Sequence, residues 1–245
     1  MPSLTDFSDV RVSIRPGFQW DAQDVYLFDI DGTLIRSRDR VHSSAFLSAA
    51  RQILGCEISL EGVPVHGGTD TAILAEACAN AGVSAQTLAE LEPAILAALS
   101  QDVLERRHEM MPVVMPGVPE TLDRLKRRGA LLGLATGNLE AIAWIKMEQA
   151  GLREWFSFGG FSDHYPIRPE LIGSAVRRAR DLAGPEASIC IVGDTPRDIH
   201  AARANSLPVI SVSTGRFEYD ELLVLDPEVC TTTLADLLAA SEAAQ

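Results

Sequence analysis

Short apolar runs alternate with segments of helical periodicity along most of the chain. Within the longer segments, apolar residues recur every three or four positions, the spacing of one buried helix face. Short buried strands alternating with such helices predict a parallel sheet covered by helices on both faces. The first 23 residues have no clear period, and two weaker elements close the chain. The strand-like runs lie at 25–30, 131–136, 188–194 and 207–213, with a short apolar piece at 155–160, and the helical segments at 117–128, 139–150, 169–182 and 196–204.

Residues 39–111, called the helical block below, interrupt this alternation. They contain no strand-like run, and their apolar residues keep helical spacing between glycines. The chain is therefore predicted to be an α/β protein, a doubly wound parallel sheet with an all-helical insertion after the first strand. The core domain would comprise residues 1–38 and 112–245. Within the helical block, helices are expected over 41–54, 71–81 and 86–109.

The composition narrows the class of function. The 245 residues carry a net charge of −13, which argues against the basic surface that nucleic-acid binding requires. No run approaches the roughly 20 apolar residues of a membrane span, and no signal-peptide pattern opens the chain, so we expect a cytoplasmic protein without a membrane partner. The four cysteines have no CxxC spacing, which favours ordinary thiols over a metal or redox site.

Carboxylates follow the strand-like runs at the positions where parallel strands end. Asp29 and Asp31 close the first run, and Asp194 and Asp198 follow the run at 188–194. Ligands bind at the carboxyl ends of strands in such sheets, so these side chains are expected to meet at one edge. Clustered carboxylates repel unless a cation neutralises them, and all-oxygen ligands suit Mg²⁺. The pattern therefore predicts a magnesium site.

The spacing of Asp29 and Asp31 suggests a division of chemical work. Residues i and i+2 of a strand point to the same side, so both carboxylates can reach one substrate. One could attack a phosphorus atom while its neighbour protonates the leaving oxygen and later deprotonates a water molecule. A carboxylate that approaches a phosphate dianion needs its charge offset, which again favours magnesium.

Three motifs, each after a predicted strand, carry a resemblance to a known family. They are DIDGT at 29–33, TGN at 136–138 and GDTPRD at 193–198. In this order they resemble the haloacid dehalogenase-like superfamily, in its phosphoglycolate phosphatase-like branch with a helical cap inserted after the first strand. The resemblance spans about residues 25–213, and the helical block occupies the position of the cap.

The resemblance implies roles for the first two motifs. Asp29 would be the nucleophile that forms an aspartyl-phosphate, and Asp31 would be the general acid and base. Thr136 would hydrogen-bond the transferring phosphoryl group. Gly137 and Asn138 would shape the loop that binds the substrate.

The third motif is implied to complete a metal site. Asp194 would bind Mg²⁺ together with Asp29 and the backbone carbonyl of Asp31. Asp198 would support the water shell of the metal or a neighbouring motif residue. The resemblance implies a small phosphorylated metabolite as the substrate, and it leaves a monomer or a homodimer open.

One position departs from the family pattern. The family has a lysine before the helix that leads to the GD motif, often followed by proline, and this chain has Arg168 and Pro169 there. Arg168 could supply the positive charge, because guanidinium groups bind phosphate oxygens well. Lys146, one of only two lysines, is disfavoured as a substitute because it lies about two and a half turns beyond Thr136.

Other polar residues allow two interpretations. The HGGTD sequence at 66–70 could face the substrate with Thr69, or it could be a glycine turn in which Thr69 or Asp70 caps the next helix. Arg36, Arg38 and Arg40 are interpreted as a solvated hinge rather than as an anion site. His42, His108, His164 and His200 lack metal-ligand spacing and are assigned to structure or surface.

A magnesium-dependent phosphomonoester hydrolase is the leading hypothesis, and two alternatives stay open. A β-phosphoglucomutase-like phosphomutase would use the same aspartates. A catalytically weakened phosphate-binding protein would explain Arg168, although the intact carboxylates speak against it. Dehalogenation does not need the proton donor Asp31, and phosphonate cleavage would need a lysine in the helical block, which has none.

Overall fold

The computed structural model describes residues 10–243, and its centre is a seven-stranded sheet in the order β1-β9-β8-β7-β2-β5-β6. Every neighbouring pair is parallel except β1 with β9. After the edge strand β1, the chain enters the central strand β2, adds β5 and β6 on one side and then β7, β8 and β9 on the other, which makes the fold doubly wound. The strands are β1 (Val12–Ile14), β2 (Val25–Phe28), β5 (Leu131–Ala135), β6 (Phe158–Gly160), β7 (Ile189–Gly193), β8 (Val209–Val212) and β9 (Val229–Thr231).

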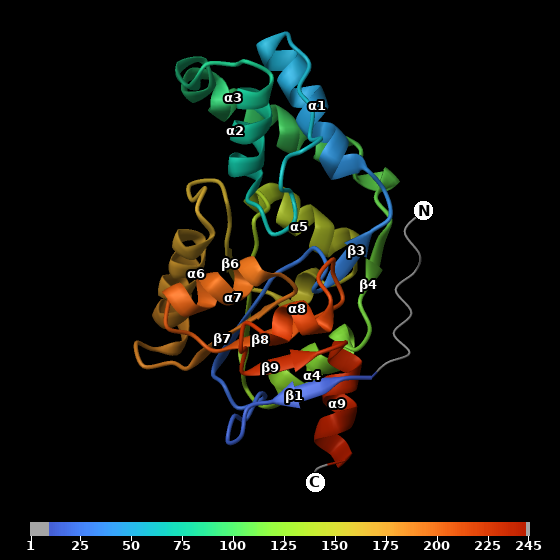
Figure 1. Cartoon of the computed structure of the whole chain (residues 1–245), viewed down its shortest axis with the longest axis vertical. Coiled ribbons are helices and arrows are strands. Elements are labelled where there is room, and N and C mark those ends of the chain that lie inside the picture. The colour runs from blue at the N-terminus through green and yellow to red at the C-terminus, as the bar shows by residue number, and fades with distance from the viewer. Residues whose placement is uncertain (1–9, 244–245) are drawn as a thin grey trace.

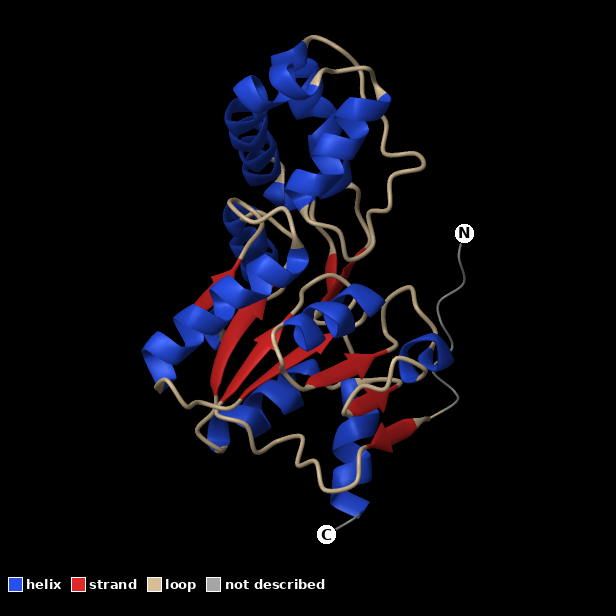
Figure 2. Cartoon of the chain, turned by 60° about the vertical axis from the view of Figure 1, so that its left-hand side comes forward, coloured by secondary structure: helices blue, strands red, loops and turns tan. Residues whose placement is uncertain are grey.

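Helices cover both faces of this sheet (Figure 1, Figure 2). Alternate residues of β2 explain why two layers are needed. Tyr26 and Phe28 pack into one apolar cluster, and Val25 and Leu27 pack into another on the opposite face. The helices are α4 (Val118–Arg127), α5 (Glu140–Gln149), α6 (Arg168–Ala183), α7 (Pro196–Ala204), α8 (Tyr219–Leu223) and α9 (Leu234–Ala243), with the 3₁₀ turn η2 (Arg153–Trp155).

The helical block stands above the carboxyl edge of the sheet (Figure 1). It consists of α1 (Val41–Leu54), α2 (Asp70–Asn80), α3 (Ala85–Glu105) and the 3₁₀ turn η1 (Arg107–Glu109). Its apolar residues form a third cluster that also takes in Leu139, Ile142 and Ile145 from the start of α5. The block therefore rests on the helix that follows the TGN motif.

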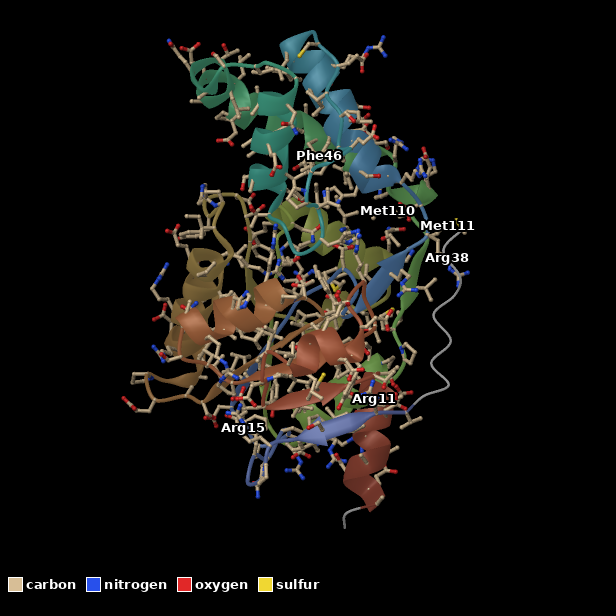
Figure 3. All side chains as sticks on the ribbon, in the orientation of Figure 1. Arg11, Arg15, Arg38, Phe46, Met110 and Met111 are labelled. Carbon is tan, nitrogen blue, oxygen red and sulfur yellow. The ribbon has the colours of Figure 1, made fainter. Side chains whose placement is uncertain are left out.

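Two short strands connect the helical block to the core. β3 (Ile35–Ser37) pairs antiparallel with β4 (Pro112–Val114), and the Arg38 amide donates to the Met111 carbonyl at 3.2 Å. Arg38, Met110 and Met111 lie together along these linking segments in Figure 3. Periodicity did not predict this ribbon. The division of the chain into two domains stays a prediction.

Apart from the β3–β4 ribbon, the differences from the expected elements concern the first 23 residues and the end of the last helix of the block. The first 23 residues, which show no period, supply β1, whose three residues are too short to display an alternation. The last helix of the block ends at Glu105 instead of 109. Within residues 10–243 no helix is long and apolar enough to cross a membrane. All four cysteines are free, and three of them are buried.

Candidate active site

Three neighbouring strands deliver the motif residues to one cavity. β2 lies between β5 and β7, parallel to both, so the segments that follow them emerge side by side. The cavity has a volume of about 500 Å³. Its core side is formed by Asp29, Asp31, Thr136, Gly137, Asn138, Lys146, Arg168, Asp194 and Thr195.

The turn after β2 fixes the position of the first two aspartates. The Asp29 amide donates to the Val192 carbonyl at 2.9 Å, which extends the ladder between β2 and β7 by one residue. Gly32 then reverses the chain at φ +93°, and a Cβ atom there would lie 2.4 Å from Asp194 Oδ2. A residue with a side chain would therefore be both strained and too close to Asp194.

Three buried carboxylates meet beneath this turn. Asp29, Asp194 and Asp198 each place an oxygen within 4.8 Å of the others. Thr33 Oγ1 donates to Asp194 Oδ1 at 2.9 Å. Asp198 forms a capping box at the start of α7, where Thr195 donates to Asp198 Oδ2 from both its amide and its hydroxyl.

Arg168 neutralises part of this acidic cluster. It is the first residue of α6 and is 6% exposed. One of its terminal nitrogens lies 2.9 Å from Asp29 Oδ1 and 2.6 Å from Asp198 Oδ1, and the other donates to the Gly67 carbonyl at 3.1 Å. The guanidinium group thus connects two carboxylates of the core with the helical block.

The remaining negative charge raises the proton affinity of the cluster. Burial, together with the charges of Asp198 and Asp31, raises the pKa of Asp29 to about 6, although Arg168 opposes the shift. Burial and the charges of Asp29 and Asp198 raise the pKa of Asp194 well above its ordinary value. A bound cation would offset the negative charge of these carboxylates and favour their ionised forms.

The donor set fits a hard divalent ion. All the nearby ligand groups are carboxylate oxygens, which suit Mg²⁺. Both oxygens of Asp198 already accept hydrogen bonds, so Asp29 and Asp194 are the better candidates for direct ligands. Among the described residues, this acidic group does not include Asp31, which leaves only its backbone carbonyl as an expected ligand.

The carboxylate of Asp31 belongs to a separate network. Asp31 Oδ2 accepts from Lys146 Nζ at 2.5 Å and from Asn138 Nδ2 at 2.9 Å. Asn138 also bonds Thr136 Oγ1 at 2.7 Å and receives Lys146 Nζ on Oδ1 at 2.7 Å. Partial enclosure in the cavity opposes ionisation of Asp31, although its side chain is 46% exposed, and the charge and hydrogen bond of Lys146 outweigh this effect and lower the pKa of the carboxyl.

The position of Lys146 corrects the expectation from its place in the sequence. Lys146 lines the cavity, and its side chain is 2% exposed. It lies six residues into α5, a rise of about 9 Å, but helical side chains lean toward the N-terminus and a lysine spans most of that distance. The buried residues Ile142 and Ala143 share its helix face, so the spacing 142, 143, 146 was the available signal.

The HGGTD loop docks against the TGN loop. The Asp70 amide donates to the Gly137 carbonyl at 2.7 Å, and Asp70 Oδ2 accepts from the Leu139 amide at 2.9 Å. A Cβ atom at Gly137 would lie 2.0 Å from the Gly68 carbonyl oxygen, so only glycine permits this approach. The two loops form part of the same cavity wall.

Thr69, a candidate for substrate binding, does not line the cavity. It is 2% exposed, and it caps α2 by accepting from the Ala72 amide. Its hydroxyl donates to the Pro166 carbonyl at 2.7 Å. The capping interpretation of this loop therefore holds for Thr69, while His66, Gly67, Gly68 and Asp70 line the cavity.

His42 also differs from its expected role. Its Nε2 lies 3.1 Å from Asp70 Oδ2, and the residue lines the cavity from α1. Arg36, Arg38 and Arg40 are not among the lining residues within the described chain. Arg36 instead donates to the Thr214 carbonyl at 2.5 Å.

The chain was compared with protein families and solved structures. A model of the haloacid dehalogenase-like hydrolases matches residues 26–212. A probable phosphatase, IndB of Dickeya dadantii strain 3937, is 29% identical over 224 residues, covering 89% of this chain and 93% of the relative. A phosphoglycolate phosphatase of Xanthomonas campestris pv. campestris strain 8004 is 28% identical over 197 residues, covering 77% of this chain and 82% of the relative.

The fold is also found in solved structures. The structure of a predicted phosphoglycolate phosphatase from Haemophilus somnus 129PT matches with a TM-score of 0.60 at 19% identity, covering 89% of this chain and 98% of that one. At this identity the likeness concerns the fold alone.

Proposed function

This chain belongs to the haloacid dehalogenase-like hydrolases and is a phosphatase of that family, and from this premise we propose that it hydrolyses a small phosphorylated metabolite in a magnesium-dependent reaction through an aspartyl-phosphate. It would be phosphoglycolate phosphatase-like in mechanism. The observation that carries the proposal is the meeting of Asp29 and Asp194 with Asp31 and Lys146 in one cavity. We further propose that it works in the cytoplasm, as a monomer or a homodimer.

Asp29 is the proposed nucleophile. Arg168 holds Asp29 Oδ1, so we assign the attack on phosphorus to Oδ2. The new bond between Oδ2 and phosphorus forms as the bond to the leaving oxygen breaks. When bound, Mg²⁺ would offset the negative charge of the carboxylates and of the phosphate dianion.

Asp31 is the proposed acid and base. It gives a proton to the leaving oxygen, and it then takes a proton from the water molecule that hydrolyses the aspartyl-phosphate. The ion pair with Lys146 favours the ionised carboxylate. A bound phosphate dianion competes for Lys146 and adds negative charge, which raises the pKa of Asp31 and allows it to carry the proton.

The remaining residues bind and enclose the phosphoryl group. Lys146, Thr136 and Asn138 are proposed to donate to its oxygens, while Gly137 lets the HGGTD loop close over it. Asp198 positions Arg168. The helical block is proposed to act as a cap that excludes bulk water during the reaction.

The test is phosphate release from a panel of esters, with Mg²⁺ and with a chelator. The panel includes phosphoglycolate, sugar phosphates, nucleotides and an aryl phosphate. Release should require Mg²⁺ and fall to background in Asp29→Asn, while Asp220→Asn, which changes an exposed ion pair with Arg11, should behave as the parent does. Full activity in Asp29→Asn would refute the nucleophile. Transfer to a second sugar hydroxyl without net release would indicate a mutase, and binding without any turnover would indicate a phosphate-binding protein.

A further inference from the structure

The cavity has two chemically distinct halves. The core half carries the aspartates, Lys146 and Arg168 described above. The half contributed by the helical block has four apolar lining residues, Phe46, Leu60, Val65 and Ile73, and is called the apolar half below, although the polar residues Asp39, His42, Ser43, His66 and Asp70 also line it. Phe46 lies among the helices of the block in Figure 3.

An aromatic pair stands out in this apolar half. The rings of His42 and Phe46, one turn apart on α1, have centroids 5.4 Å apart and planes inclined by 31°. The polar edge of His42 is engaged with Asp70. The side chain of His42 is 18% exposed and Phe46 is 3% exposed, so a ligand would contact mainly the ring of His42, with Phe46 packed against it.

The cations of the cavity are already committed to carboxylates. Among the described lining residues, the lysine and arginine side chains are those of Lys146 and Arg168, and each forms ion pairs with motif aspartates. Burial and then the charge of Arg216 lower the pKa of His66, so its imidazole is neutral near pH 7. Arg216 itself is not a lining residue.

Further carboxylates face the same space. Asp39 lines the cavity and accepts from the amides of Val41 and Met111 at 3.0 and 2.6 Å, and Asp70 lines it as well. A carboxylate on the leaving group of a substrate would thus lose its hydration beside other anions. The apolar half disfavours a second anion.

A neutral hydroxyl without a partner in the described part of the chain lies in the wall of the cavity. The side-chain oxygen of Ser37 is buried and has no hydrogen-bond partner among the described residues, and Ser37 lines the cavity. A hydroxyl can pair with an uncharged donor or acceptor. Ser37 therefore adds no charge that would attract an anionic leaving group.

We propose that the enzyme prefers phosphomonoesters whose leaving group is an uncharged, ring-bearing alcohol that packs against His42 and Phe46, over esters whose leaving group carries a carboxylate. This inference rests on the proposed phosphatase function and specifies its substrate class. The volume agrees, since pockets of about 300–1,000 Å³ hold ligands much larger than a two-carbon ester. Burying a flat ring beside an aromatic pair supplies binding free energy that a carboxymethyl group cannot.

The experiment compares esters that share the phosphate and differ in the leaving group. We would measure kcat/KM for ethyl phosphate, phosphoglycolate, benzyl phosphate and 4-carboxybenzyl phosphate. Benzyl alcohol is a poor leaving group like ethanol, so the comparison reports on binding rather than on chemical activation. Benzyl phosphate should exceed phosphoglycolate and 4-carboxybenzyl phosphate by about tenfold or more, within the range that pocket contacts provide.

Variants of the helical block test the location. Phe46→Ala should lower kcat/KM for benzyl phosphate about tenfold and change that for ethyl phosphate less than about twofold. Leu47→Ala, the next residue of α1 and 36% exposed, is the matched control and should change neither. If Phe46→Ala does not fold, Leu60→Ala, which removes a half-buried lining residue, replaces it.

A binding measurement separates the two proposals. Calorimetry with Asp29→Asn gives the affinities for benzyl phosphate and phosphoglycolate without turnover. Two results would overturn the leaving-group inference and leave the phosphatase function intact. One is tighter binding of phosphoglycolate than of benzyl phosphate. The other is an equal loss of kcat/KM for ethyl phosphate and benzyl phosphate in Phe46→Ala. Absence of turnover with every ester in the parent enzyme would overturn the phosphatase function, and the ranking of affinities would still decide the preference.

Discussion

Lys146 Nζ lies 2.5 Å from Asp31 Oδ2, although 115 positions separate the two residues. The contact joins the turn after the central strand to the helix after the TGN motif. It puts a buried cation next to the proposed acid and base. The site therefore has two cations with separate partners, one for Asp31 and one for Asp29 and Asp198.

Replacement of Lys146 should impair catalysis more than folding. Lys146→Met keeps the length of the side chain in a buried position and removes its charge. We expect kcat/KM to fall about 100-fold or more, the usual effect of losing one donor to a developing negative charge. The chain should stay folded, because Asp31 is 46% exposed at its side chain and remains solvated. Steady-state kinetics measures kcat/KM, and circular dichroism shows whether the variant is folded.

The other lysine provides the control for this variant. Lys126 is exposed on α4, where it donates to the Glu154 carbonyl and lies over the Trp155 ring. Lys126→Met should retain the parent activity. Equal activity in Lys146→Met and the parent would exclude Lys146 from the reaction.

Arg168 is expected to matter for stability as well as for activity. Arg168→Ala would leave Asp29 and Asp198 buried without their partner, which costs about 3–5 kcal/mol in the free energy of unfolding. Arg168→Lys should recover part of this loss, because an ammonium group keeps the charge but cannot reach both carboxylates and the Gly67 carbonyl together. Urea unfolding compares the variants in a metal-free buffer.

Arg180→Ala is the control, since Arg180 is exposed in the last turn of the same helix. Its effect should stay within about 0.5 kcal/mol. A loss in Arg168→Ala no larger than that of Arg180→Ala would contradict the ion-pair account.

Stabilisation by Mg²⁺ should grow with pH. The pKa of Asp29 is raised to about 6, so folding increases its proton affinity and the metal-free protein loses this contribution as the pH rises from about 4 through 6. A divalent ion binds the deprotonated carboxylates. The increase in Tm on adding Mg²⁺ should therefore be small near pH 5 and larger near pH 8.

Thermal unfolding with Mg²⁺ or a chelator across this range measures the effect. Asp194→Asn should reduce the increase in Tm at every pH, because it removes one of the proposed ligands. Asp220→Asn should leave it unchanged. An increase in Tm with Mg²⁺ that does not vary between pH 5 and pH 8 would argue against the carboxylates with raised pKa values as the metal site.

Gly137 should control the docking of the HGGTD loop. In Gly137→Ala the new methyl group would meet the Gly68 carbonyl, so the loop must move and its contact with the core should weaken. We expect a higher KM and faster amide hydrogen exchange in residues 66–70. Gly173→Ala is the control, because a methyl group there meets only the flexible ends of the Asn205 and Arg177 side chains. Unchanged exchange at 66–70 would show that the loop does not depend on this approach.

The sequence was sufficient for most of the sheet. The strands β2 (Val25–Phe28) and β5 (Leu131–Ala135) are buried along almost their whole length, so they are apolar throughout and are recognised without tertiary information. The edge strand β1 was missed because three half-exposed residues carry no period. The β3–β4 ribbon was missed for the same reason. Each of its strands has only three residues and is stabilised by pairing with the other, so neither shows a pattern of its own.

The residues of the candidate site also fall into two groups, those that the sequence predicts and those that depend on packing. The residue pattern alone indicates that Asp29, Asp31, Thr136 and Asp194 follow strands of a parallel sheet, and this topology requires them to share one edge. Packing in the folded chain brings Lys146 to Asp31, turns Thr69 toward Pro166, and puts His42 and Phe46 in the cavity wall. Those three depend on how α5 and the helical block pack on the sheet, which is set by long-range apolar contacts and not by local spacing.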